Sequence, residues 1–77
     1  MITIDELKLY GWNTMKKDTS TWYYDGWEYQ YHIKSNELHY LNDGAEETYI
    51  AKIKDMGELK ETYYLLENKE MIQIEIN

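Results

Sequence analysis

The two histidines of the chain, His32 and His39, are the residues whose type and spacing most directly suggest chemistry. A two-residue turn at Ser35-Asn36 would place them opposite each other on neighbouring antiparallel strands. Two imidazoles together with Glu28 or Glu37 offer zinc ligands. A closed zinc site, however, needs three or four ligands that a supporting shell holds in place. We therefore interpret both histidines as solvated side chains on the polar face of a sheet, and we predict no metal site and no cofactor.

Nucleophilic catalysis has few candidate groups in this sequence. There is no cysteine, and the only two serines, Ser20 and Ser35, lie near expected turns. The sequence contains no arginine and no glycine-rich phosphate-binding motif. Paired carboxylates such as Glu46-Glu47 arise readily by chance in a chain with 15 acidic residues. We therefore predict that the protein is not an enzyme and has no catalytic residues.

The charge of the chain narrows the range of partners. Fifteen acidic residues against eight lysines give a formal net charge of −7 over 77 residues. Direct binding to nucleic acid or to an anionic membrane needs cationic side chains, so this charge argues against both. A charge of this size either serves solubility or complements a partner protein with a basic surface.

An acidic array with two tyrosines is the predicted partner-binding surface. Alternate residues on a strand lie about 6–7 Å apart, which resembles the spacing of neighbouring phosphates on one nucleic-acid strand. Such an array would occupy a basic groove that otherwise binds DNA or RNA, unless it is simply a solvated acidic face. The predicted residues are Glu46, Glu47, Asp55, Glu58, Glu61, Glu67 and Glu70, with Tyr23 and Tyr64 as anchors.

An aromatic hairpin at residues 21–33 must organise the sheet that positions these groups. Asp25-Gly26 stands between two apolar alternations, which is a strong signal for a tight turn. Ser35-Asn36 and Asp43-Gly44 predict two further turns, and alternation keeps one set of side chains on a common face. That set is Trp22, Tyr24, Trp27, Tyr29, Tyr31, Ile33, Leu38, Tyr40, Tyr49, Ala51 and Ile53.

Two helices are predicted to flank the sheet. Thr3 and Glu6 have the spacing of a capping box, and Gly11 suits the end of this first helix. Residues 13–19 are polar and predict a loop. A second helix is predicted between Asp55 as N-cap and Asn68 as a left-handed stop. Its apolar face would contain Met56, Leu59, Tyr63 and Leu66.

The C-terminal part of the chain has a second interpretation. Residues 71–76 alternate and predict a final strand. Residues 61–66 could pair with that strand as a further hairpin in place of the helix. Either way, the pattern predicts one α+β domain over residues 1–77. Its fold class would be an antiparallel β-meander of four to five strands with a short N-terminal helix and a second helix packed on one face.

The tyrosine content suggests that some rings lie at the surface. The chain has nine tyrosines and no phenylalanine, and tyrosine is favoured where a ring is half-buried and its hydroxyl meets water. We expect Trp22, Trp27, Tyr29, Tyr31 and Leu38 in the core. Tyr23, Tyr64 and either Tyr10 or Tyr24 are expected at the surface. A tyrosine-rich sheet can also stack sugars, so a small-ligand or sugar binder using this aromatic platform is an alternative function.

The compartment is predicted from what the chain lacks. The absence of cysteine fits a reducing environment. The N-terminal Met-Ile-Thr-Ile-Asp-Glu has neither the basic nor the apolar region of a signal peptide, and no apolar run is long enough to span a membrane. These features predict a cytoplasmic protein.

Two segments, Thr3–Trp12 and Met56–Tyr63, resemble sequences common in short proteins of phages and mobile elements of low-GC bacteria. The arginine-free composition, rich in lysine, asparagine, tyrosine and isoleucine, is similar to that of such proteins. They include anti-CRISPR and other anti-defence inhibitors, many of which are acidic. The resemblance implies a host-directed inhibitor of a nucleic-acid-binding protein in a bacterial cytoplasm. A structural or assembly protein of phage type, which self-associates through exposed tyrosines or a sheet edge, is the other alternative.

Overall fold

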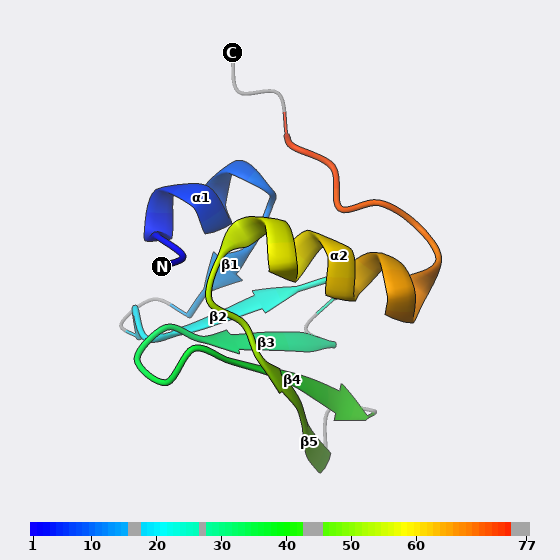
Figure 1. Ribbon diagram of the computed structural model, residues 1–77. Coiled ribbons are helices and arrows are strands. Elements are labelled where there is room, and N and C mark those ends of the chain that lie inside the picture. The colour runs from blue at the N-terminus through cyan, green and yellow to red at the C-terminus, as the bar shows by residue number, and fades with distance from the viewer. Residues whose placement is uncertain (16–17, 27, 43–45, 75–77) are drawn as a thin grey trace.

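The computed structural model describes residues 1–15, 18–26, 28–42 and 46–74, and it confirms the α+β class. Two helices, α1 (Ile4–Leu9) and α2 (Met56–Glu67), accompany a five-stranded antiparallel sheet. Figure 1 shows both helices on the same side of that sheet. The strands follow chain order and are β1 (Asn13–Thr14), β2 (Thr21–Tyr24), β3 (Tyr29–His32), β4 (Glu37–Asn42) and β5 (Glu46–Lys52).

In the hairpins β2–β3 and β3–β4, each side chain lies on the sheet face that the sequence predicts, but the residues pair in a different register from the predicted one. Asp25 and Gly26 have positive φ angles of 56° and 67°, as the predicted turn requires. The paired residues that close this hairpin are nevertheless Tyr24 and Tyr29, so the loop has four residues instead of two. The next hairpin is closed by His32 and Glu37 in the same way. Each shift is two residues, which leaves every side chain on its predicted face.

The register of the third hairpin moves the side chains of residues 46–49 to the face opposite the predicted one. Leu38 pairs with Ala51, whereas His39 pairs with Tyr49, so β5 has one extra residue, Ile50, at this point. The prediction of Tyr49 on the aromatic face is therefore wrong, and its ring is 53% exposed beside His39. The predicted turn residues Asp43-Gly44 lie outside the described residues.

The helix ends follow the predicted capping residues. The Thr3 hydroxyl accepts from the Glu6 amide at 3.1 Å, and the Glu6 carboxylate accepts from the Thr3 amide at 3.0 Å. In α2, the Asp55 carboxylate accepts from the Glu58 amide, and Asn68 ends the helix with a φ of 57°. The alternative hairpin over residues 61–66 is therefore wrong.

Two segments differ from the predicted elements. The predicted loop at residues 13–19 contains β1, which pairs with β2 at the edge of the sheet. The predicted final strand is absent over residues 71–74, where the chain packs beside α1 and the Ile74 amide donates to the Leu9 carbonyl at 2.8 Å. The Ile74 amide thus makes its hydrogen bond with the end of α1 and not with a sheet edge.

The core lies between the sheet and the two helices. It contains four of the five residues predicted to be buried, while the fifth, Trp27, lies outside the described residues. The buried apolar residues are Ile2, Leu7, Trp12, Trp22, Tyr29, Tyr31, Leu38, Ile53, Met56, Leu59, Tyr63 and Met71. Leu66, predicted to be on the buried face of α2, is 49% exposed. No helix in the described part of the chain is long and apolar enough to cross a membrane.

Buried tyrosines predict a loss of stability at alkaline pH. Burial raises the pKa of Tyr31 to about 12, and burial together with hydrogen bonds to Glu67 and Asp25 raises the pKa values of Tyr29 and Tyr63. Unfolded tyrosine titrates near pH 10, so above that pH the unfolded state loses protons that the folded state keeps. The free energy of unfolding is therefore expected to fall between about pH 10 and pH 12.

Urea unfolding followed by circular dichroism at a series of pH values checks this prediction. The urea midpoint should be steady near pH 8–9 and should fall steeply above about pH 10. Tyr64, which is 45% exposed, supplies the control, because Tyr64→Phe should leave the pH dependence unchanged. A urea midpoint that stays constant up to pH 12 would contradict the buried state of these phenols.

Candidate functional site

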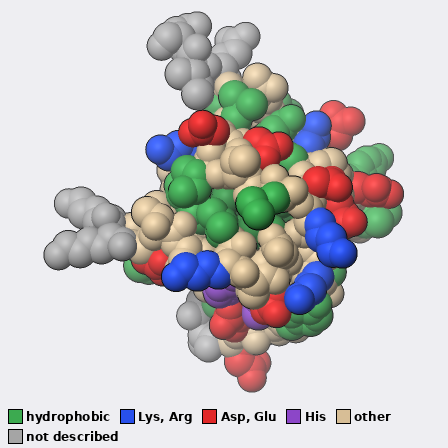
Figure 2. All heavy atoms as spheres, turned by 60° about the vertical axis from the view of Figure 1, so that its left-hand side comes forward, with side chains coloured by type: hydrophobic (Ala, Val, Ile, Leu, Met, Phe, Trp, Pro, Cys, Tyr) green, Lys and Arg blue, Asp and Glu red, His purple; other side chains and the backbone are tan. Residues whose placement is uncertain are grey.

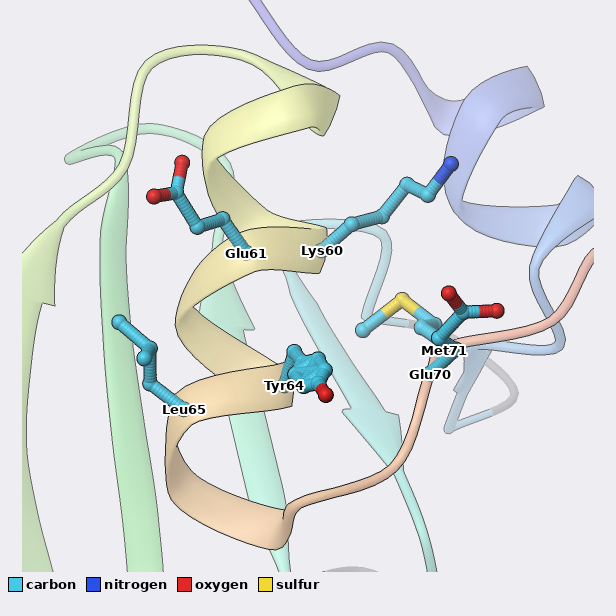
Figure 3. A pocket seen from close by; sticks show the side chains of 6 residues that line it. All are labelled: Lys60, Glu61, Tyr64, Leu65, Glu70 and Met71. Carbon is cyan, nitrogen blue, oxygen red and sulfur yellow. The ribbon is translucent and has the colours of Figure 1, made fainter.

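A surface groove runs between α2 and the segment that follows it. The chain reverses at Asn68, so that Glu70 and Met71 lie beside residues of the middle of α2. The groove has a volume of about 340 Å³ and is lined by Lys60, Glu61, Tyr64, Leu65, Glu70 and Met71. Figure 3 shows Glu61 and Leu65 on one side of the helix. Tyr64 extends toward the segment that carries Glu70 and Met71, and Lys60 extends toward α1.

Buried contacts hold the two walls of this groove. Met71 is 3% exposed, and the Trp12 indole N–H donates to its sulfur at 3.3 Å. On α2, Leu59 and Tyr63 face the core, which leaves the opposite side of the helix toward solvent. The core therefore holds the helix wall of the groove, and the contact with Trp12 holds the other wall at Met71.

The exposed side of α2 near the groove carries three large apolar side chains. Tyr64, Leu65 and Leu66 are consecutive, and they are 45%, 80% and 49% exposed. The Lys60 ammonium is directed to α1, where it donates to the Tyr10 hydroxyl at 3.2 Å and lies 5.0 Å from the Tyr10 ring centroid. The exposed carboxylates of Glu61 and Glu70 border the apolar patch, and the Lys60 ammonium does not lie between these carboxylates and the patch.

Three of the predicted partner-binding residues meet at this groove, namely Glu61, Tyr64 and Glu70. Two others cap α2: Asp55 accepts from the Glu58 amide at 2.8 Å, and Glu58 accepts from the Lys54 amide at 3.0 Å. These two carboxylates are also exposed, so they contribute to the negative surface at the start of the helix.

The other four predicted residues lie elsewhere. The half-buried Glu67 accepts a hydrogen bond of 2.5 Å from the Tyr29 hydroxyl. Tyr23 is half-buried on β2. Glu46 and Glu47 are on β5, and Glu47 lies on the sheet face opposite α2. The sheet therefore divides the predicted array between two faces of the molecule.

The sheet face opposite the helices contains a cluster of two histidines and a glutamate, of which the sequence indicated only the histidines. His32 and His39 are diagonal neighbours on β3 and β4, with ring centroids 4.5 Å apart. The predicted direct cross-strand pairing is wrong, because the hairpin loop is longer by two residues. One Glu47 oxygen lies 3.0 Å from His32 Nε2 and 3.1 Å from His39 Nδ1. Figure 2 shows the histidines at the surface beside acidic side chains.

Glu47 is the third member of this group, whereas the sequence suggested Glu28 or Glu37. Glu37 contacts His39 from the other side, with its Oε1 2.9 Å from His39 Nε2. Asn42 pairs with Glu46, so three residues separate the closing pair, and Glu47 pairs with Leu41 on this face. A regular two-residue turn at Asp43-Gly44 would have paired Glu47 with Tyr40 on the other face. The extra residue Ile50 then returns Ala51 to the core face, opposite Leu38. The turn residues in the sequence give no signal of that irregularity.

Comparison with protein-family models, curated proteins and solved structures finds no match for this chain. The function must therefore be inferred from the two surfaces themselves.

Proposed function

We propose that this chain is a non-enzymatic protein-binding module that docks a partner with a basic surface through the groove beside α2. The proposal rests on one observation, the exposure of Tyr64, Leu65 and Leu66 next to the carboxylates of Glu61 and Glu70. Three consecutive exposed apolar side chains on a short helix are typical of an interaction surface. Aromatic and aliphatic anchors inside a charged rim match the organisation of protein–protein interfaces.

The charge of the chain supports a basic partner. A net charge of −7 favours encounter with a cationic surface, and the rim carboxylates would orient that encounter. Glu58 and Glu61 are three residues apart on α2, which places neighbouring carboxylates on one side of the helix. The basic surface is one that otherwise binds nucleic acid, so that the bound chain acts as an inhibitor of the anti-defence type.

Photo-crosslinking identifies the partner for a quantitative test. A photoreactive amino acid at position 65 captures proteins from a bacterial lysate, and the captured protein is purified. Its affinity for the chain is expected to fall about tenfold or more between about 50 mM and about 300 mM salt. Labelled duplex nucleic acid bound to the captured protein is expected to be released by the wild-type chain.

Paired charge reversals show whether the groove carries the affinity. Glu61→Lys with Glu70→Lys is expected to weaken binding by about tenfold to hundredfold. Asp5→Lys with Glu28→Lys makes the same change in net charge at exposed sites outside the groove, and its effect should be several-fold smaller. Equal losses in both pairs, or affinity that responds to neither salt nor the groove pair, would overturn the proposal.

Self-association is a separate outcome of the same experiment. The exposed apolar patch would also suit a second copy of the chain. If the crosslinked species is a dimer of this chain and sedimentation gives a mass that rises with concentration, the groove is a homotypic interface. The inhibitor proposal would then be wrong.

A further inference from the structure

We infer that His32, His39 and Glu47 form a three-ligand site for a divalent transition-metal ion, of which zinc is the best fit. The site lies on the sheet face opposite the groove and is independent of the proposed function. One ligand atom from each residue lies within 4.8 Å of the other two, and Glu47 Oε1 contacts both His32 Nε2 and His39 Nδ1. Two imidazoles and one carboxylate are a ligand set that zinc uses when it keeps a fourth position open to water.

The distances between the ligand atoms are close to those of a formed site. Tetrahedral ligands at about 2.0–2.1 Å from zinc lie about 3.4 Å from one another. The Glu47 oxygen is 3.0 Å from His32 Nε2 and 3.1 Å from His39 Nδ1. Small side-chain rotations would therefore open these two contacts far enough for the ion to enter.

The hydrogen bonding of His39 directs one lone pair toward the centre of the site. The 2.9 Å contact between His39 Nε2 and Glu37 is satisfied when Nε2 carries the proton and donates it to the carboxylate. In the neutral ring, Nδ1 is then an acceptor, and this buried atom has no hydrogen-bond partner in the described part of the chain. It lies against a Glu47 oxygen that is also an acceptor, so a cation between the two would remove their repulsion.

Glu37 supplies the supporting contact that zinc-binding histidines usually have. A carboxylate that accepts the second ring N–H fixes the tautomer and orientation of the histidine and raises its basicity as a ligand. With Zn²⁺ bound, the positive charge of the ion balances the two carboxylates of Glu47 and Glu37 while both imidazoles stay neutral. Glu47 supplies the third ligand, and Glu37 supplies the supporting contact, both of which a histidine pair alone lacks.

The strands hold the ligands in place and leave the site accessible. Each ligand comes from a different strand of a continuous antiparallel sheet, β3, β4 or β5. The side chains of His39, His32 and Glu47 are 16%, 28% and 42% exposed, so an ion can enter directly from solvent. A bound ion would link three neighbouring strands and stabilise the folded chain.

Zinc titration of the metal-free protein at pH 7.5 tests the site, because an ordinary imidazole is neutral at that pH. Calorimetry should show one Zn²⁺ per chain, and the melting temperature should rise by about 10 °C or more at a hundredfold excess over the Kd. Long-range proton–nitrogen spectra should show coordination through Nδ1 of His39 and Nε2 of His32. Coordination of both rings through Nε2 would overturn the inference, since Glu37 holds that atom of His39.

Glutamine substitutions keep the side-chain size and separate the roles of the carboxylates. Glu47→Gln should weaken zinc binding by about a hundredfold, and Glu37→Gln by about tenfold to hundredfold. Glu46→Gln is the matched control, because it alters the neighbouring exposed carboxylate and should leave zinc affinity unchanged. No binding by the wild-type chain at about 1 mM Zn²⁺, or equal binding by all three variants, would show that these residues form no metal site.

Discussion

Replacing Trp12 with alanine is expected to lower the free energy of unfolding by about 3–5 kcal/mol. Trp12 is 2% exposed and stacks on Tyr24, with ring centroids 5.0 Å apart. It also donates to the sulfur of Met71, so it links the end of α1, strand β2 and the C-terminal segment. A chain of this length has a total stability of about 4–12 kcal/mol, and the loss would therefore remove a large part of it.

Urea unfolding followed by far-ultraviolet circular dichroism measures this loss without relying on tryptophan fluorescence. Trp12→Phe is the companion variant, because it keeps a ring against Tyr24 but removes the indole N–H. It should cost about half as much or less. A loss below about 1 kcal/mol for Trp12→Ala would contradict the central position of this residue.

Replacing Leu59 with alanine is expected to cost about 2–5 kcal/mol, because its side chain is fully buried beneath α2. It lies between Met56 and Tyr63 on the helix, and Tyr63 contacts the Tyr24 and Tyr29 rings of the sheet. Loss of the Leu59 side chain would leave a cavity where the helix meets the sheet. Thermal and urea unfolding of the variant measure the effect.

Leu65→Ala is the matched control for Leu59→Ala on the same helix. Leu65 is 80% exposed, so its truncation should change the stability by no more than about 0.5 kcal/mol. The same variant should weaken partner binding at the groove. A variant at position 65 that destabilises the fold as strongly as Leu59→Ala would contradict the orientation of α2.

The buried and exposed faces of α2 show how much of the groove local sequence patterns predict. The spacing of Met56, Leu59 and Tyr63 correctly predicts the buried face of α2. Leu66 follows the same spacing but is exposed, and at the last turn Glu67 approaches the sheet and accepts from the Tyr29 hydroxyl. At the end of a helix, the helical period alone does not predict which side chain packs against the sheet, because that depends on where the sheet ends.

The groove itself follows from a contact that is distant in sequence. Tyr64, Glu61 and Glu70 were predicted as partner-binding residues from type and charge, whereas Leu65 and Met71 were not. The alternating residues 71–76 resemble a strand, yet within the described range Met71 contacts Trp12, and the Ile74 amide donates to the Leu9 carbonyl at the end of α1. An alternating pattern specifies two faces, and it does not specify which surface will cover the apolar one.

The sequence by itself determined the helix caps, the α2 boundaries and the face of the sheet on which Trp22, Tyr29, Tyr31 and Leu38 lie. These features depend on local hydrogen bonding and on a period of two, which survives a register shift of two residues. Only the tertiary structure decided the lengths of the first two hairpin loops and the extra residue in β5.

The register of β5 against β4 matters most for the histidines. It turns Tyr49 and Glu47 away from the core, and it thereby places a carboxylate between His32 and His39. A shift of one residue reverses every side chain on one side of it, here residues 46–49, and its position is set by packing between whole strands rather than by the turn residues. The sequence could therefore indicate the two imidazoles, but only the folded sheet could supply the third ligand atom.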